Sequence, residues 1–222
     1  MRFKANDSLT EQIAQHLGNQ IILGLMRPGE RIQELRIASE LDVSRGSVRE
    51  ALLILQRRHL VNIYPRRGAV VASISAREVH DFFGLWFLLL DTVVGNMARQ
   101  WQNDDLARFF ELLGQLEASR QHNDIQGFYQ QGVAFLQALY GFADNHYIES
   151  TLRDLLPLTQ RCLYAILRAG SPQVEHTYVF LEELLKVIIA RDTLRLQTMI
   201  RQFGADYGRL AAASAEALEG VQ

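Results

Sequence analysis

The stretch from residue 34 to residue 71 constrains the fold of this chain more than any other part. Its sequence is ELRIASELDVSRGSVREALLILQRRHLVNIYPRRGAVV. It has the pattern of a short helix, a tight turn, a second helix, and two strands, at 60–64 and 69–72, around a basic turn. Ser44 is a favourable N-cap for the second helix, and Asp42 tolerates a left-handed backbone in the turn. This order of elements predicts a winged helix-turn-helix.

The helix in front of this stretch begins at a capping box, in which the Ser8 hydroxyl accepts an amide hydrogen bond and Glu11 reaches back. Four apolar residues at four-residue spacing mark its buried face: Ile13, Leu17, Ile21 and Leu25. In the short helix that follows, we expect Leu35 and Ala38 to face inward.

A second capping box, from Ser75 to Glu78, marks the start of a second domain, so we expect the domains 1–74 and 75–222. Strand patterns end there. Six helices are expected, at about residues 76–101, 103–121, 124–142, 146–168, 173–190 and 192–217. Pro157 is expected to kink the fourth. The predicted fold is mainly α, with three helices and a β-hairpin wing followed by an all-α six-helix bundle.

The charge of the chain is divided unevenly between these two domains. Residues 1–74 hold 11 Lys and Arg against 7 Asp and Glu, whereas residues 75–222 hold 12 against 18. A basic head on an acidic body is typical of a nucleic-acid-binding module joined to a domain with another role. A chance asymmetry would give the same counts, so charge alone does not decide.

Composition also bears on the compartment. Cys162 is the single cysteine, which excludes a disulfide within the chain and a cysteine-based zinc site, and its apolar surroundings predict a buried small hydrophobe. The first residues lack the apolar core of a signal peptide. The longest uninterrupted apolar run is far short of about 18 residues, so we expect no membrane span and a soluble, cytoplasmic protein.

The second helix of the helix-turn-helix carries the chemistry for DNA binding. Arg45 and Arg49 lie four residues apart, on one face of its first turns, where guanidinium groups reach guanine edges or phosphates. Gly46 lets the backbone come close, and Ser44 and Ser47 offer hydroxyls. The free amides of the helix N-terminus add a phosphate site. The alternative is an ordinary solvated face.

The turn of the wing supplies two further cations. Arg66 and Arg67 are expected to reach the DNA backbone or the minor groove. For Arg57 and Arg58, a solvated helix end is the better interpretation.

Three segments, PGERIQE, ELRIASELDVSRGSVREAL and HLVNIYPRRGAVVA, resemble the DNA-binding domain of the GntR family of bacterial transcription regulators. The helical remainder, with Asn145 after a long helix, is similar to the FadR-like subfamily. The resemblance implies a homodimer that binds double-stranded DNA at an inverted repeat of the GT…AC kind. Its DNA contacts, carried over by position, are Ser44, Arg45, Gly46, Ser47, Arg49, Arg67 and Gly68. Arg36 is a weaker candidate.

Members of that subfamily often hold a metal ion through one Asp and three His. The matching positions here are Gly132, Leu136, Leu181 and Phe203. None of these side chains can coordinate zinc or a similar ion. The position of an arginine that meets carboxylate ligands in relatives is Trp86. We therefore expect neither a metal nor another cofactor.

The same positions leave two possibilities for the helical domain. Six residues could line a pocket for an apolar or weakly polar effector: Trp86, Leu90, Gly132, Leu136, Leu181 and Phe203. They could equally form a solid core, since apolar stripes on helices are usually core.

The resulting prediction is a ligand-responsive DNA-binding regulator, for example a repressor, that binds a palindromic operator as a dimer. The alternative is a DNA-binding dimer without an effector, whose pocket is closed and packed. An enzyme is not expected, because the sequence offers no nucleophile with a base, no carboxylate pair at helical spacing in an apolar setting, and no phosphate-binding loop.

Overall fold

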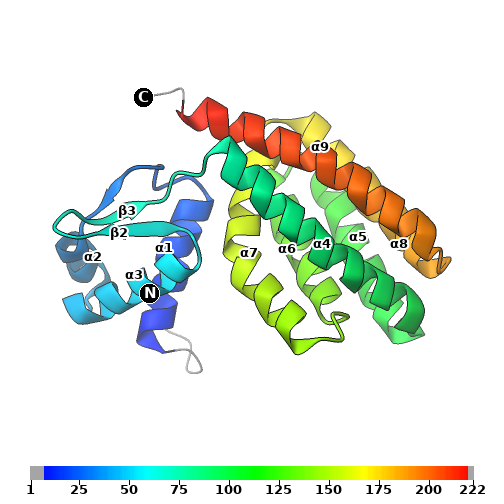
Figure 1. The fold of residues 1–222 in the computed structure, drawn as a ribbon, viewed down its shortest axis with the longest axis horizontal. Coiled ribbons are helices and arrows are strands. Elements are labelled where there is room, and N and C mark those ends of the chain that lie inside the picture. Colours follow the sequence, from blue (N-terminus) through cyan, green and yellow to red (C-terminus); the bar gives the residue numbers. More distant parts are fainter. Residues whose placement is uncertain (1–7, 220–222) are drawn as a thin grey trace. The chain divides into compact units, whose positions relative to one another are not determined.

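A computed structural model describes residues 8–219, and the chain divides into two compact units (Figure 1). One unit comprises Met1–Ile74 with Leu155–Arg161, and the other comprises Ser75–Asp154 with Cys162–Gln222. We use "head" for residues 8–74 and "body" for residues 75–219. The mainly helical fold, with a winged helix-turn-helix followed by a helical bundle, confirms the predicted fold class.

The head contains three helices and a small antiparallel sheet. The elements are α1 (Leu9–Ile22), β1 (Arg31–Ile32), α2 (Glu34–Leu41), α3 (Arg45–Arg57), β2 (Val61–Tyr64) and β3 (Gly68–Val71). The predicted hairpin is present, with Tyr64 opposite Gly68 and Val61 opposite Val71. The sheet order is β1-β3-β2, so β3 is the central strand. Strand β1 was not expected, because two residues show no period of their own and only their pairing with β3 makes them a strand.

Two predicted core positions of the head are wrong. Leu25 is 71% exposed because α1 ends at Ile22, and the chain then turns at Gly24, whose φ is 71°. Leu35 is 63% exposed, while Ile37 and Ala38 form the buried face of α2. Helical residues two apart point about 200° away from each other, so a helix that buries Ile37 exposes Leu35.

The capping box at the start of α1 is only half formed. The Ser8 hydroxyl accepts a hydrogen bond from the Glu11 amide at 3.2 Å, as expected. The Glu11 carboxylate instead accepts a hydrogen bond from the Arg58 guanidinium at 2.5 Å. Arg58 therefore does not lie on a solvated helix end; it ties the end of α3 to the start of α1.

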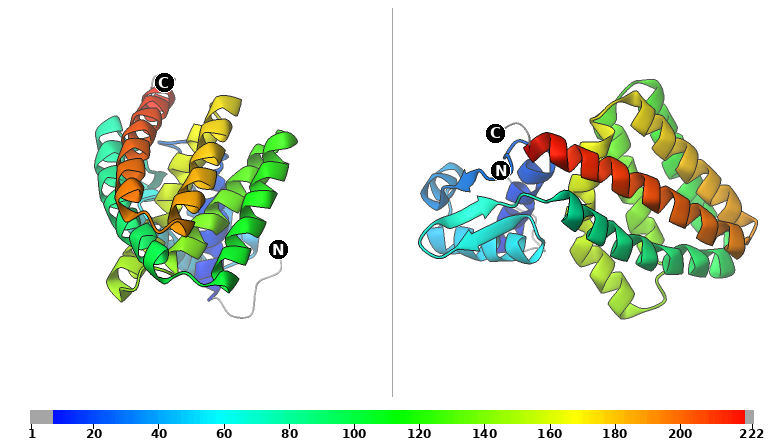
Figure 2. Two further views of the ribbon diagram at one scale, coloured as in Figure 1. Left: turned by 90° about the vertical axis from the view of Figure 1, so that its right-hand side faces the viewer. Right: turned by 45° about the horizontal axis from the view of Figure 1, so that its top comes forward.

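The body is a bundle of six helices, as predicted (Figure 2). They are α4 (Ala76–Gln100), α5 (Asn103–Gln121), α6 (Ile125–Tyr140), α7 (His146–Leu167), α8 (Ser171–Ile189) and α9 (Thr193–Glu219). Helix α8 begins two residues earlier than expected, because Pro172 is accommodated in its first turn. Helix α7 continues through Pro157 as a single helix.

Helix α4 packs mainly against α9 and also touches α8 and α6. Among the described residues, α4 is also the one helix that is long and apolar enough to cross a membrane by length and composition. An uninterrupted apolar run is a stricter measure than average hydropathy, which is why the sequence did not indicate such a helix. A core helix passes the same test, and α4 has ten buried residues, which lie along its length from Val79 to Ala98.

The start of α4 gives a test of the capping box. The Ser75 hydroxyl accepts from the Glu78 amide at 3.3 Å, and the Glu78 carboxylate accepts from the Ser75 amide at 2.8 Å and from the Ser75 hydroxyl at 2.7 Å. These hydrogen bonds lower the pKa of Glu78 below its ordinary value of 4.5. We expect Ser75→Ala to lower the free energy of unfolding of the body by about 1 kcal/mol at pH 7.

The sign of the pH dependence follows from the lowered pKa. A carboxyl with a depressed folded pKa stabilises the fold above its unfolded pKa and loses that contribution as the pH falls through the folded pKa. Urea unfolding should therefore show a difference in the free energy of unfolding between wild type and Ser75→Ala that becomes smaller as the pH falls from 7 to 3. Ser39→Ala, at an exposed serine inside α2, is the control; equal losses for Ser75→Ala at both pH values would contradict the prediction.

Candidate nucleic-acid interface and effector cavity

The start of α3 is built by local hydrogen bonds. Ser44 caps the helix by accepting from the Ser47 amide at 3.0 Å, and the two hydroxyls lie 2.9 Å apart. Asp42 takes the left-handed conformation expected of it, with φ 53° and ψ 50°. A Cβ at Gly46 would meet only the Ser44 hydroxyl, at an ordinary 3.5 Å. The fold itself does not require glycine at position 46, so the open backbone there is available to a bound molecule.

Arg45 and Arg49 lie on the exposed side of α3, and both face the same acidic residue. The Arg49 Nε atom donates to Glu34 Oε2 at 2.7 Å, and an Arg45 terminal nitrogen lies 3.7 Å from the same oxygen. The side chain of Arg45 is 52% exposed and that of Arg49 is 63% exposed, whereas the side chain of Glu34 is 22% exposed. Glu34 is not identifiable from the sequence, because it stands 15 residues before Arg49 and no local pattern links the two.

The wing presents the other pair of arginines. The turn between β2 and β3 closes with the Arg67 amide donating to the Tyr64 carbonyl at 3.2 Å. Arg66 adopts a left-handed backbone with φ 65°, and Gly68 has φ 80°. Both arginines are exposed, and neither makes an ion pair within the described part of the chain.

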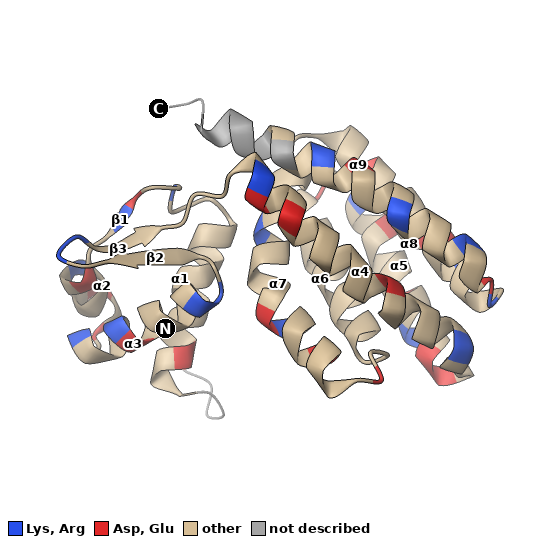
Figure 3. Ribbon diagram, viewed as in Figure 1, with Lys and Arg blue, Asp and Glu red and all other residues tan. Residues whose placement is uncertain are grey.

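Basic side chains therefore gather on α3 and at the turn of the wing (Figure 3). The α3 N-terminus adds unpaired backbone amides to these cations. This arrangement can hold phosphates through charge and amides, and it can offer guanidinium groups to base edges. The structure thus brings together the expected contact residues of α3 and, on the wing, Arg66, Arg67 and Gly68.

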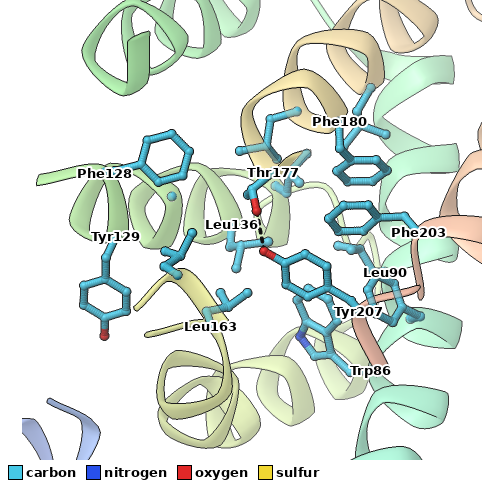
Figure 4. Close-up of a pocket in the computed structure, with 16 residues that line it drawn as sticks. Trp86, Leu90, Phe128, Tyr129, Leu136, Leu163, Thr177, Phe180, Phe203 and Tyr207 are labelled. Carbon is cyan, nitrogen blue, oxygen red and sulfur yellow. Dashed lines mark hydrogen bonds between the residues drawn. The ribbon is translucent and has the colours of Figure 1, made fainter. Parts of the chain in front are cut away.

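A cavity lies inside the body, enclosed by residues of α4, α6, α7, α8 and α9 (Figure 4). All six residues named from the sequence line it: Trp86, Leu90, Gly132, Leu136, Leu181 and Phe203. Ten further residues complete the lining, and most of these are also aromatic or aliphatic. The sequence did not single them out, because helical apolar stripes do not reveal which members face a void.

Aromatic rings fill one side of this cavity. The ring of Phe203 stacks on that of Phe180, with centroids 3.5 Å apart, and on that of Tyr207, at 4.4 Å. Three of the polar side chains of the lining are hydrogen-bonded within the protein: the Trp86 indole donates to the Tyr140 hydroxyl at 3.1 Å, and the Tyr207 and Thr177 hydroxyls hydrogen-bond to each other. The lining offers no charged group.

The space open to a water-sized sphere is about 50 Å³. That is enough for a few water molecules, and it is far below the roughly 300–1,000 Å³ of typical ligand pockets. In this conformation, the interior of the body is close to a packed core. A ligand larger than a few atoms would need the lining side chains to move.

The residues at the four metal-ligand positions of the FadR-like subfamily lie together in this cavity, but they offer no donor for a metal. Within residues 8–219, as far as side chains are described, no group of three or more His, Cys, Asp and Glu side chains is placed to hold a metal ion. His176 is exposed, and its ring lies 5.3 Å from that of Phe203 without lining the cavity.

Comparisons with known proteins agree with this architecture. Residues 9–71 match the family model described as "Bacterial regulatory proteins, gntR family", and residues 87–205 match the model described as "FCD domain". The HTH-type transcriptional repressor GlaR of Escherichia coli is 27% identical over 194 residues, 84% of this chain and 88% of GlaR. The gluconate operon transcriptional repressor of Bacillus licheniformis is 25% identical over 158 residues, 71% of this chain and 65% of that protein.

Two solved structures share the fold. E. coli McbR/YncC superposes with a TM-score of 0.77 at 21% identity, covering 90% of this chain and 95% of that chain. The "putative transcriptional regulator GntR" of Rhodococcus sp. RHA1 also gives a TM-score of 0.77, at 23% identity, covering 93% of this chain and 99% of that chain.

The buried Tyr207 hydroxyl gives a pH-dependent test of the cavity wall. Burial raises the pKa of Tyr207 to about 12, and its hydrogen bond to Thr177 lowers the pKa by a smaller amount. A tyrosine whose pKa is raised in the folded state stabilises the fold below its unfolded pKa of 10. This stabilisation is lost as the pH rises through 12. We expect the free energy of unfolding to fall between pH 10 and pH 12.

Tyr207→Phe should weaken this alkaline loss, because phenylalanine cannot ionise. It should also cost about 1 kcal/mol at pH 7, the usual value of one hydrogen bond. Burial raises the pKa of Tyr129 as well, so part of the alkaline loss should persist in the variant. Urea unfolding at pH 7, 10 and 11.5 measures both effects, and an unchanged pH slope in Tyr207→Phe would count against the assignment.

Proposed function

Because the chain belongs to the GntR family of bacterial regulatory proteins and carries an FCD domain behind its DNA-binding head, we propose that it acts as a homodimer on an inverted-repeat operator. The protein is a DNA-binding transcription regulator and not an enzyme. Two-fold symmetry of a dimer requires two symmetric half-sites, which we propose to be of the GT…AC kind. Its place of action is the cytoplasm, and its relatives named as repressors support repression as its mode.

The observation that carries this proposal is the exposed cationic start of α3 beside a cationic wing. We assign base reading to Arg45 and Arg49, because they lie in the first turns of the recognition helix. Arg66 and Arg67 are assigned to phosphates or the minor groove. The remaining proposed contact residues either let the protein backbone come close to DNA or hydrogen-bond to its phosphates; they are Ser44, Gly46, Ser47 and Gly68.

We further propose that an apolar or weakly polar effector enters the body at the cavity described above. Its lining supplies aromatic and aliphatic surface and no fixed charge, which disfavours an anionic ligand held by a metal. An effector would act by binding one arrangement of the dimer more tightly than another, since only differential affinity shifts a conformational equilibrium. Entry requires the cavity to expand beyond its present 50 Å³.

A second candidate function is supported by that small volume. A body whose aromatic core is already filled would serve as a dimerisation domain alone, and the protein would regulate transcription without an effector. The stacked rings of Phe180, Phe203 and Tyr207 favour this alternative, because they occupy the space that a ligand would need.

Ligand titration separates the two candidates. We expect an apolar ligand to release operator DNA and to raise the melting temperature, and the first probes are fatty acids and acyl-CoAs because their acyl chains are apolar. A ligand at 100 times its Kd would add about 2.7 kcal/mol of stability. Addition of EDTA should change neither result. Gly132→Leu, which places a side chain into open space at the cavity, should abolish the response.

Gly114→Leu on the exposed side of α5 is the matched control and should leave the response intact. A response that needs a divalent metal would refute the apolar effector. No response to any apolar ligand, with an unchanged melting temperature, would support the effector-independent regulator.

Substitution of Arg49 tests the DNA interface. We expect Arg49→Ala to lower operator affinity toward that for unrelated DNA, because each of the two half-sites loses a bidentate contact that supplies about 1–3 kcal/mol of discrimination. The probe is a duplex that the wild-type protein enriches from random-sequence DNA, and binding is followed by fluorescence anisotropy. Circular dichroism and sedimentation should remain those of the folded dimer.

Two other arginines give the contrast. Arg57→Ala, in the last turn of α3, should leave operator affinity unchanged. Arg67→Ala should weaken binding to operator and unrelated DNA alike and reduce the salt dependence by about one phosphate contact. Unchanged operator affinity in Arg49→Ala would refute the assignment of base reading to this residue.

A further inference from the structure

Glu34 lies where a carboxylate is electrostatically unfavourable for DNA binding. It is the first residue of α2, and its Oε2 atom faces both arginines at the start of α3. The three groups together carry a net charge of +1 instead of +2, on the face that we propose to approach a polyanion. A surface selected only for strong attraction to phosphate would not keep a partly buried acid there.

The geometry of the contact indicates a different role. Glu34 accepts from Nε of Arg49 at 2.7 Å, so it uses the nitrogen nearest the aliphatic stem and leaves the two terminal nitrogens free. A guanidinium is planar, and a bond at Nε fixes the direction in which its terminal pair of nitrogens points. Those two nitrogens can still bond O6 and N7 of one guanine.

The difference in exposure supports this role. The Glu34 side chain is held at 22% exposure, while Arg49 remains 63% exposed. The acid is therefore the fixed partner and the arginine the presented one. By comparison, the ion pair of Arg36 and Glu40 on the same helix is exposed at both partners, whose side chains are 51% and 56% exposed. Its distance from Arg36 Nε to Glu40 Oε1 is also longer, at 3.5 Å.

We propose that Glu34 is a positioning residue that raises the sequence discrimination of the recognition helix. It orients Arg49 for one base pair, with Arg45 as a weaker second partner, and it lowers the affinity for DNA of any other sequence by offsetting one positive charge. The inference rests on the proposed operator reading by α3, and it adds that an acidic residue outside α3 sets the selectivity of that reading.

Glu34→Gln tests this proposal, because glutamine keeps the size and an acceptor oxygen while removing the charge. We measure the Kd for the operator enriched by the wild-type protein and for a scrambled duplex of the same length. The scrambled duplex should bind more tightly, and the ratio of the two affinities should fall about tenfold, within the range of one lost base contact. Glu40→Gln, on the same helix, should keep the ratio within twofold of wild type.

A second readout separates positioning from a general structural role. Operator duplexes with each base pair of the half-site replaced in turn should show that Glu34→Gln and Arg49→Ala relax the preference at the same base pair. An even loss over all positions would overturn the proposal, as would an unchanged affinity ratio in a Glu34→Gln protein with the wild-type melting temperature. If the wild-type protein does not discriminate between the two duplexes, the operator proposal itself fails, which is a distinct outcome.

Discussion

The close contact of α4 with α9 is the constraint on which the body depends. Gly204 of α9 lies against the ring of Phe87, and a Cβ at this position would come within 2.9 Å of it. Only glycine allows this approach, and with it Tyr207 of α9 meets Phe83 of α4 and Phe203 of α9 meets Phe87 of α4, both edge to face. Such aromatic contacts bury large areas and fix ring geometry. The cavity and its lining are consequences of this one packing arrangement.

The same aromatic packing explains why the interior of the body is nearly solid. The positions that would hold a metal in FadR-like relatives carry Gly132, Leu136, Leu181 and Phe203, and they still face one another. The stacking of Phe203 on Phe180 fills space next to them. A charge in such a lining would lack partners and would be costly, so residues without charge at these four positions are compatible with the aromatic cluster beside them.

The head is organised by a different kind of interaction, the local capping of α3. Ser44 holds the helix start and Asp42 sets the turn. The buried side of α3, with Val48, Ala51, Leu52 and Leu55, leaves Arg45 and Arg49 exposed beside it. The contact with Glu34 then links α2 to the cationic face of α3. In the proposed mechanism, attraction to DNA and selectivity for its sequence are set by different residues, and the acidic residue belongs to another helix.

The sequence by itself determined the features that depend on neighbours along the chain. The approximate helix bounds, the caps at Ser44 and Ser75 and the turn at Asp42 followed from local residue types. The tertiary structure alone decided the pairing of β1 with β3, the exposure of Leu35 and the volume of the cavity. It also decided the sharing of Glu34 by two arginines. Each of these depends on which residues distant in sequence come into contact, and local propensity and periodicity carry no signal for such contacts.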